Sequence, residues 1–148
     1  MHKTIVALCL TCGVVLLQPS LSTAEQLQYF GKPVRGVPVS PVVKVGKLIF
    51  VSGTPGFKEG KVAVGDFTAQ MKQVMENLSS ELKSAGVGWD RVVKTNVLLT
   101  RTEDFSDMNR VYATYFTDGK YPARTTTFVA GLPSPDFLLE IDCEAILE

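Results

Sequence analysis

Hydrophobic residues along the chain follow two kinds of spacing, one typical of strands and one typical of helices. Residues 42–45 and 48–52 predict two short strands joined by a tight turn at 46–47. The glycine- and proline-containing segment 52–56 predicts the end of the second strand. Residues 25–41, which come before these strands, show no sustained period and predict an irregular arm.

Two segments predict helices that each bury one face. The first has hydrophobic residues at spacings of three and four, and Gly86 follows them as a stop signal. These residues are Phe67, Met71, Val74, Met75, Leu78 and Leu82. Thr102 is expected to cap the second helix. The predicted buried stripe of that helix consists of Phe105, Met108, Tyr112 and Tyr115.

The remaining hydrophobic runs predict three further strands. Residues 91–99 place Val93, Thr95, Val97 and Leu99 on one side of a strand, and residues 124–129 are rich in β-branched residues. The last strand alternates Leu139, Ile141, Cys143 and Ala145 on one face with Leu138, Glu140, Asp142 and Glu144 on the other.

The order of these elements predicts an α+β fold in which both helices cover one face of a sheet. The other face would then expose Phe50, Leu98 or Phe128 to water. We therefore expect the protein to form an oligomer through that face.

The first 24 residues have the pattern of a secretory signal peptide. Lys3 precedes an apolar run over residues 5–17 that is too short to span a membrane as a stable helix, and Ser22-Thr23-Ala24 supplies small residues before a cleavage site. We expect cleavage after residue 24, an arm over residues 25–41, and one domain over residues 42–148. The mature protein would be periplasmic or secreted, without stable insertion in a membrane. An uncleaved membrane anchor is the alternative.

Composition narrows the possible chemistry. The chain has 15 Lys+Arg against 15 Asp+Glu and no basic stripe on either predicted helix, so binding to nucleic acid is not expected. His2, the only histidine, falls in the predicted signal peptide together with Cys9 and Cys12. The mature chain would keep Cys143 as its one thiol, expected as a small buried residue, and could form no internal disulfide. It would also lack a Ser-His or Cys-His nucleophile, and a catalytic zinc site is not expected.

Four segments, taken in order over roughly residues 41–145, resemble the RidA/YjgF family. They are LIFVSG at 48–53, VVKTNV at 92–97, DFSDMN at 104–109 with Tyr112, and YPARTT at 121–126, the last followed by Leu132-Pro133 and by EID at 140–142. The resemblance implies a chorismate-mutase-like fold assembled as a homotrimer, with active sites in the clefts between subunits. It also implies hydrolysis of reactive enamines and imines, such as 2-aminoacrylate, to a 2-oxo acid and ammonia, without a metal or an organic cofactor.

Arg124 and Glu140 are the candidate catalytic residues for this chemistry. A 2-imino acid carries a carboxylate next to an electrophilic C=N carbon, and the guanidinium fork of Arg124 matches that carboxylate through two parallel hydrogen bonds. Glu140 is the candidate that orients the attacking water and accepts its proton. The alternative for this pair is a structural salt bridge across neighbouring strands.

Ser52, Gly53, Asn109 and Thr126 are the candidate substrate-binding residues. Ser52 and Gly53 would line the cleft, although a simple turn also explains them. Asn109 would be a hydrogen-bond donor in the cleft or else a residue at its boundary. Thr126 lies two residues after the arginine, where the family uses backbone groups near the substrate.

Two departures from the family concern the wall of the pocket. Val39 stands where members commonly carry a tyrosine, and Thr54-Pro55-Gly56 replaces the more usual Gln-Ile-Pro. The same clefts in a protein without activity would make a module that binds a small carboxylate or a partner protein, and this is the alternative function.

Overall fold

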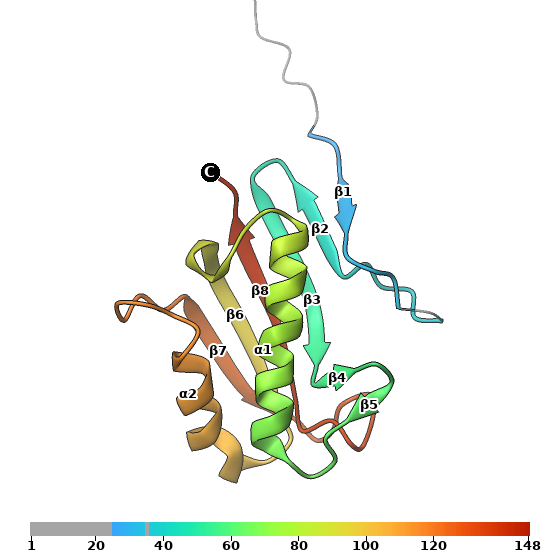
Figure 1. Ribbon diagram of the computed structural model, residues 1–148, viewed down its shortest axis with the longest axis vertical. Coiled ribbons are helices and arrows are strands. Elements are labelled where there is room, and N and C mark those ends of the chain that lie inside the picture. Colours follow the sequence, from blue (N-terminus) through green and yellow to red (C-terminus); the bar gives the residue numbers. More distant parts are fainter. Residues whose placement is uncertain (1–24, 35) are drawn as a thin grey trace, which may run out of the picture.

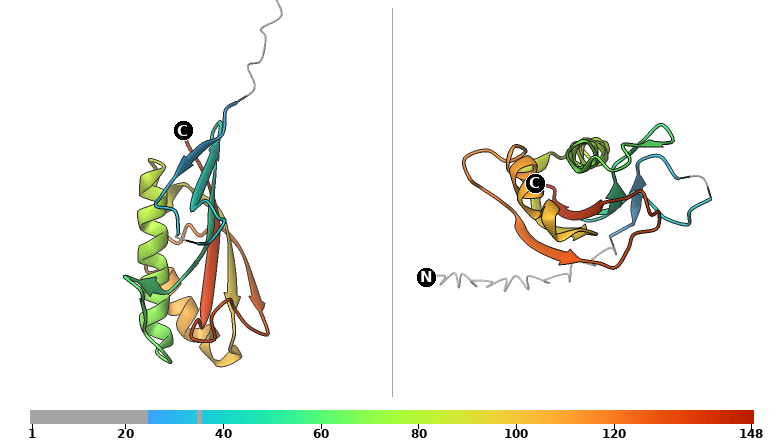
Figure 2. Two further views of the ribbon diagram at one scale, coloured as in Figure 1. Left: turned by 90° about the vertical axis from the view of Figure 1, so that its right-hand side faces the viewer. Right: turned by 90° about the horizontal axis from the view of Figure 1, so that it is seen from below.

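The computed structural model describes residues 25–34 and 36–148, and the predicted signal peptide lies outside these residues. A six-stranded sheet in the order β1-β2-β3-β8-β6-β7 carries both α-helices on one face (Figures 1 and 2). Its strands are β1 (Gln28–Phe30), β2 (Val42–Val45), β3 (Leu48–Pro55), β6 (Val92–Leu99), β7 (Ala123–Phe128) and β8 (Leu139–Ile146). The helices are α1 (Phe67–Ser84) and α2 (Phe105–Ala113). The predicted α+β architecture is confirmed.

The sheet is mixed, and the direction of each strand follows from the connection that precedes it. β1, β2, β3, β8 and β6 pair antiparallel, whereas β7 pairs in parallel with β6 because α2 carries the chain from the end of one strand back to the start of the other. The core lies between the sheet and the helices. On β8, Leu139 and Ile141 are fully buried against the helices and alternate with Glu140 and Asp142, so the predicted alternation of this strand is confirmed.

β3 runs further than predicted. A bulge between Val51 and Thr54 lets the strand continue through Ser52 and Gly53 to Pro55 while it remains paired with β8. The prediction that residues 52–56 end the strand was wrong, because one irregular pairing absorbs the two residues that would break the ladder.

Two short pieces of β-structure were missed. β1 lies within the arm that was predicted to be irregular and pairs with β2, and the hairpin of β4 (Phe57–Lys58) and β5 (Lys61–Val62) follows β3. Strands of two or three residues are too short to show an alternating hydrophobic pattern. Whether such short segments form strands depends instead on the segments with which they pair.

The N-terminal end of α2 differs from the prediction. Thr102 makes no capping hydrogen bond; a 3₁₀ turn over Thr102–Asp104 precedes the helix, and Asp104 accepts two hydrogen bonds from Arg101 at 2.6 and 2.9 Å. Phe105, predicted in the buried stripe, is 41% exposed. Met108 and Tyr112 are buried as predicted.

Two residues lie on the other side of the sheet from the one predicted. A bulge in β6 places Val92 in the core and leaves Val93 exposed. Phe128 pairs in register with buried Leu99, and its ring contacts Phe105 of α2, so it lies on the helix side rather than on the open face.

The face of the sheet without helices keeps hydrophobic groups at its surface. Phe50 is 42% exposed and Leu98 is half-buried, and Leu48 and Ile146 add to this open face. Oligomerisation through it stays a prediction. No helix among residues 25–34 and 36–148 combines the length and hydropathy needed to cross a membrane.

Candidate active site

Arg124 lies near the start of β7 with its side chain against α2. Its Nη2 donates a hydrogen bond of 2.7 Å to Asn109 Oδ1, and its Nη1 lies 3.6 Å from the Met108 sulfur. The guanidinium carbon is 4.9 Å from the centre of the Tyr112 ring, in the geometry of a cation–π contact. All three partners come from α2 and all are neutral, so they orient the guanidinium without cancelling its charge.

Tyr112 is held in turn by a hydrogen bond to the sheet. Its hydroxyl shares a buried hydrogen bond of 2.8 Å with Thr95 Oγ1, and Thr95 is the residue that pairs in register with Arg124. Burial raises the pKa of the Tyr112 phenol, so the ring stays neutral under the arginine. This stack of Thr95, Tyr112 and Arg124 was not predicted, although Tyr112 lies one helical turn after Asn109, which was a candidate.

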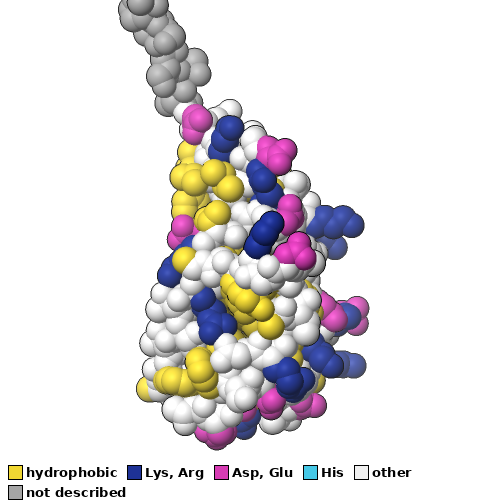
Figure 3. All heavy atoms as spheres, turned by 90° about the vertical axis from the view of Figure 1, so that its left-hand side faces the viewer, with side chains coloured by type: hydrophobic (Ala, Val, Ile, Leu, Met, Phe, Trp, Pro, Cys, Tyr) yellow, Lys and Arg dark blue, Asp and Glu magenta, His cyan; other side chains and the backbone are white. Residues whose placement is uncertain are grey.

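The guanidinium faces a cavity of about 440 Å³ at the edge of the sheet. The cavity is lined by Asn109, Tyr112, Ala113, Tyr121, Pro122 and Arg124. Figure 3 views the molecule from the side of α2 and β7, where hydrophobic side chains gather next to Lys or Arg side chains. The lining contains no carboxylate, so an anion entering from solvent would meet an arginine that no acidic neighbour neutralises.

Glu140 occupies a different place, on the open face of β8. Its neighbours in register are Pro55 on β3 and Leu98 on β6. Burial raises the pKa of the Glu140 carboxyl, and the nearby Asp142 carboxylate raises it further. Gly53 lies against this carboxyl, since a Cβ atom there would collide with Glu140 Oε1. The missing side chain in the β3 bulge therefore makes room for Glu140.

Ser52 is used structurally. Its hydroxyl donates a 2.7 Å hydrogen bond to the Ser40 carbonyl, and its backbone N–H donates a 2.9 Å bond to the Pro41 carbonyl. These two bonds fasten the arm to the bulge. Val39, the residue before Ser40, is 41% exposed.

The structure thus divides the predicted residues into two groups on opposite faces of the sheet. Arg124 and Asn109 lie on the helix side, and Thr126 faces the same way because it pairs in register with buried Val97. Ser52, Gly53 and Glu140 form the second group, around the β3 bulge and the open face. Because β6 separates β7 from β8, the alternative of an Arg124–Glu140 salt bridge across neighbouring strands is wrong within one chain.

Two other features bear on the chemistry. Cys143 is buried as predicted, and burial raises the pKa of its thiol to about 12, so it is not a thiolate nucleophile at neutral pH. Within the described part of the chain, no group of three or more His, Cys, Asp or Glu side chains is placed to hold a metal ion.

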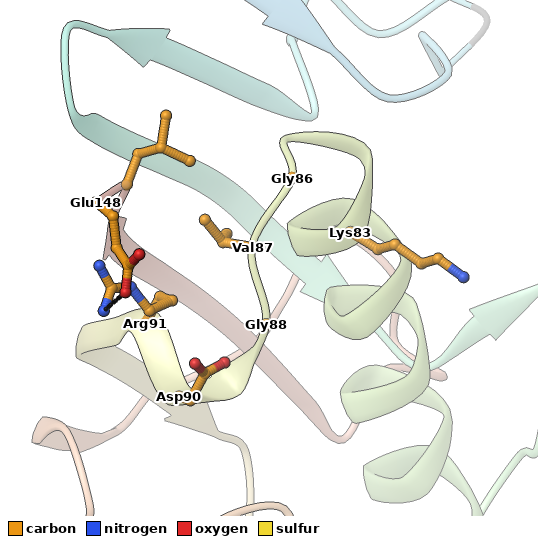
Figure 4. A pocket seen from close by; sticks show the side chains of 8 residues that line it. Lys83, Gly86, Val87, Gly88, Asp90, Arg91 and Glu148 are labelled. Atoms are coloured by element: carbon orange, nitrogen blue, oxygen red, sulfur yellow. Dashed lines mark ion pairs between the residues drawn. The ribbon is translucent and has the colours of Figure 1, made fainter.

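A larger hollow of about 540 Å³ lies between the end of α1 and the C-terminal residues (Figure 4). Its two cations, Lys83 and Arg91, are balanced by Asp90 and Glu148, and Arg91 Nη1 is 3.1 Å from Glu148 Oε1. None of the predicted site residues lines it. The cavity at Arg124 is smaller, but it holds an unneutralised cation, so it is the better candidate for binding an anion.

Comparison with known proteins decides the family. The family model described as Endoribonuclease L-PSP matches residues 32–147. The chain belongs to this Rid/YjgF/L-PSP family. Human 2-iminobutanoate/2-iminopropanoate deaminase is 37% identical over 133 residues, which are 88% of this chain and 91% of the human one. A RutC family protein of Synechocystis is 35% identical over 128 residues, 84% of this chain and 98% of the other.

Solved structures of the Rid family share the fold. Escherichia coli TdcF, crystallised with bound serine, superposes with a TM-score of 0.76 at 27% identity, covering 82% of this chain and 99% of that one. Among the sequence relatives, some are named as imine deaminases, whereas others carry only a family name. The resemblance inferred from the sequence motifs is confirmed at the level of the family.

Proposed function

We propose that this Rid family protein hydrolyses reactive 2-imino acids, and the enamines that tautomerise to them, to 2-oxo acids and ammonia. The observation that carries the proposal is the partly exposed guanidinium of Arg124, which faces a cavity and contacts neutral groups. The human relative named as a 2-iminobutanoate/2-iminopropanoate deaminase supports the same reaction class.

The two groups of residues form one site only when two copies meet. Arg124, Asn109 and Thr126 of one subunit would face Glu140, Gly53 and Ser52 of the next, since the two sets lie on opposite faces of a single chain. A homotrimer with clefts between subunits, as the family resemblance implies, would close this arrangement and cover the hydrophobic groups of the open face. The periplasmic or secreted location inferred from the N-terminal sequence belongs to the same proposal.

Each group has a defined task in the reaction. The substrate carboxylate would take two charge-assisted hydrogen bonds from the Arg124 fork, each contributing about 1.5 to 3 kcal/mol. A water molecule, oriented by Glu140, would attack the C=N carbon of the protonated imine while the carboxylate of Glu140 accepts a proton from that water, which gives a neutral carbinolamine. Glu140 would then return the proton to the amino group, and ammonia would leave as the hydroxyl proton passes back to Glu140 and the C=O bond of the 2-oxo acid forms. The raised pKa of Glu140 makes it a stronger base than an ordinary carboxylate.

The test is an imine-consumption assay on the purified mature protein. D-amino-acid oxidase generates the 2-imino acid in situ, and semicarbazide competes for it, so enzymatic hydrolysis appears as a lower rate of semicarbazone formation. We expect turnover with wild type and a fall in kcat/KM of about 100-fold or more in Arg124→Ala, because two charge-assisted hydrogen bonds are lost.

Arg124→Lys is the matched variant. It keeps the charge but not the fork, so it should retain more activity than Arg124→Ala and less than wild type. Ligand-dependent stabilisation without turnover of any imine would instead support the alternative, a trimer that binds a small carboxylate or a partner protein. Equal rates in wild type and Arg124→Ala would remove the arginine from the mechanism.

A further inference from the structure

The cavity at Arg124 has one ionic group and one amide, that of Asn109, and its other walls are apolar or aromatic. Tyr112 lies under the guanidinium, and Ala113, Tyr121 and Pro122 complete the side away from Asn109. A ligand whose carboxylate binds Arg124 would therefore place the rest of its body against rings and aliphatic carbon. The volume of about 440 Å³ belongs to the half of the site that one chain supplies, and the neighbouring subunit would form the opposite wall.

The Tyr121 wall is supported by other aromatic rings, although Tyr121 is 56% exposed. Its ring packs edge-on against Phe116, with centroids 5.8 Å apart, and Phe116 in turn packs against Tyr112 and Trp89. Pro122, the next residue, restricts the backbone of Tyr121 to extended conformations. An aromatic wall held in place before the ligand arrives loses little conformational entropy on binding.

The group around Glu140 has the same character. Its carboxyl lies between Pro55 and Leu98 in register, with the bare backbone of Gly53 against it. Both halves of the proposed site thus place apolar surface beside an ionic group, and Asp142 adds a second carboxylate on the Glu140 side. A substrate as small as 2-aminoacrylate, whose side chain is a single methylene carbon, would leave most of that surface in contact with water.

We propose that the preferred substrates are 2-imino acids with a large apolar side chain, above all an aryl side chain, and that Tyr121 is the residue that selects them. This inference rests on the proposed deaminase function. Tyr121 would act by contact with the substrate side chain, since burial of apolar surface in a preformed pocket favours the larger substrate. The hydrolysis itself is unchanged: water adds to the C=N carbon and ammonia leaves.

The experiment compares kcat/KM for the imines that D-amino-acid oxidase makes from alanine, leucine and phenylalanine. Wild type should prefer the phenylalanine-derived imine to the alanine-derived one by about tenfold or more. In Tyr121→Ala this ratio should fall about tenfold, because kcat/KM for the phenylalanine-derived imine falls more than kcat/KM for the alanine-derived imine. Tyr121→Phe keeps the ring and should keep the preference.

The outcomes separate the two proposals. Turnover that favours the alanine-derived imine, or a preference that survives in Tyr121→Ala, overturns the aryl specificity and leaves the deaminase standing. Absence of turnover with every imine overturns the deaminase and the specificity together. Circular dichroism and size-exclusion chromatography of each variant verify that a lost preference reflects the pocket rather than the fold.

Discussion

At the scale of the residue, the environment of Glu140 affects both the basicity of its carboxylate and the stability of the fold. Its carboxyl is partly buried beside Leu98, Pro55 and Asp142, and burial and the neighbouring charge both raise its pKa. The folded state therefore binds the Glu140 proton more tightly than the unfolded chain does. Proton binding at Glu140 therefore stabilises the folded state. This stabilisation is fully present below the ordinary carboxyl pKa and is lost as the pH rises through the raised pKa. The raised pKa would make Glu140 a stronger base in the proposed site, and it lowers the stability of the folded protein at neutral pH.

Glu140→Gln should consequently separate activity from stability. We expect kcat/KM to fall by about 10² to 10⁴, the range for removal of a general base, and the melting temperature at pH 7 to 8 to rise above that of wild type. The difference in melting temperature should vanish below about pH 4, where the wild-type carboxyl is protonated in both states. Thermal unfolding across this pH range measures it. Glu144→Gln, on the same face of β8 and exposed, is the control; a Glu140→Gln protein less stable than wild type at neutral pH would contradict the argument.

At the scale of the element, α1 fixes two loops through one fully buried side chain. Gln70 Nε2 donates to the carbonyls of Ala63 at 2.9 Å and Asp136 at 2.8 Å, and its Oε1 accepts a 2.9 Å hydrogen bond from the Leu138 N–H. The segment before α1 and the loop that leads into β8 are thereby tied to the same helix turn. This tie holds Leu138, the residue directly before β8 and two residues before Glu140.

Gln70→Leu should destabilise the fold, because it removes three hydrogen bonds and leaves the N–H of buried Leu138 without a partner. A buried unsatisfied group costs about 1 to 3 kcal/mol, so we expect a loss of roughly that size in the free energy of unfolding measured with denaturant. Gln73→Leu on the same helix is the matched control, since Gln73 is only half-buried and bonds a side chain, Asn77. Equal losses in the two variants would show that the tie between the loops adds nothing.

At the scale of the whole molecule, the sheet separates the two halves of the proposed site. Arg124 faces α2, whereas Glu140 lies on the open face, two strands away in the sheet. A single chain of this fold therefore presents the proposed carboxylate-binding residue, Arg124, on one side and the proposed base, Glu140, on the other. The proposed chemistry depends on contact between copies.

Mixed oligomers test this arrangement directly. Arg124→Ala and Glu140→Gln subunits, each expected to be nearly inactive alone, should recover activity when coexpressed in equal amounts. If neighbouring copies complete each site, roughly a quarter of the sites in a random mixture combine an intact arginine with an intact glutamate. Coexpression of Arg124→Ala with the double variant supplies no intact arginine and should stay inactive. Failure of the first mixture to exceed this control would place both residues of a site in one chain.

The sequence by itself determined what depends on local periodicity. The three- and four-residue spacing from Phe67 to Leu82 set the buried face of α1, and the alternation from Leu139 to Ala145 set that of β8, because helix and strand repeats fix which side chains share a face. The four segments that include the motif around Arg124 likewise identified the family. Asn109 was a candidate because it belongs to another of these segments, but its hydrogen bond to Arg124 was not predicted.

The tertiary structure decided what depends on pairing between distant segments. Bulges moved Val93 out of the core and kept Gly53 within β3, and no local pattern encodes a bulge, since the partner strand determines where one extra residue is absorbed. The strand order inserts β6 between β7 and β8, and the register aligns Arg124 with buried Thr95 but Glu140 with Leu98, so the two side chains lie on opposite faces. Strand order and register follow from the packing of the whole sheet against its helices, so residues that the sequence pairs by chemistry were separated by topology.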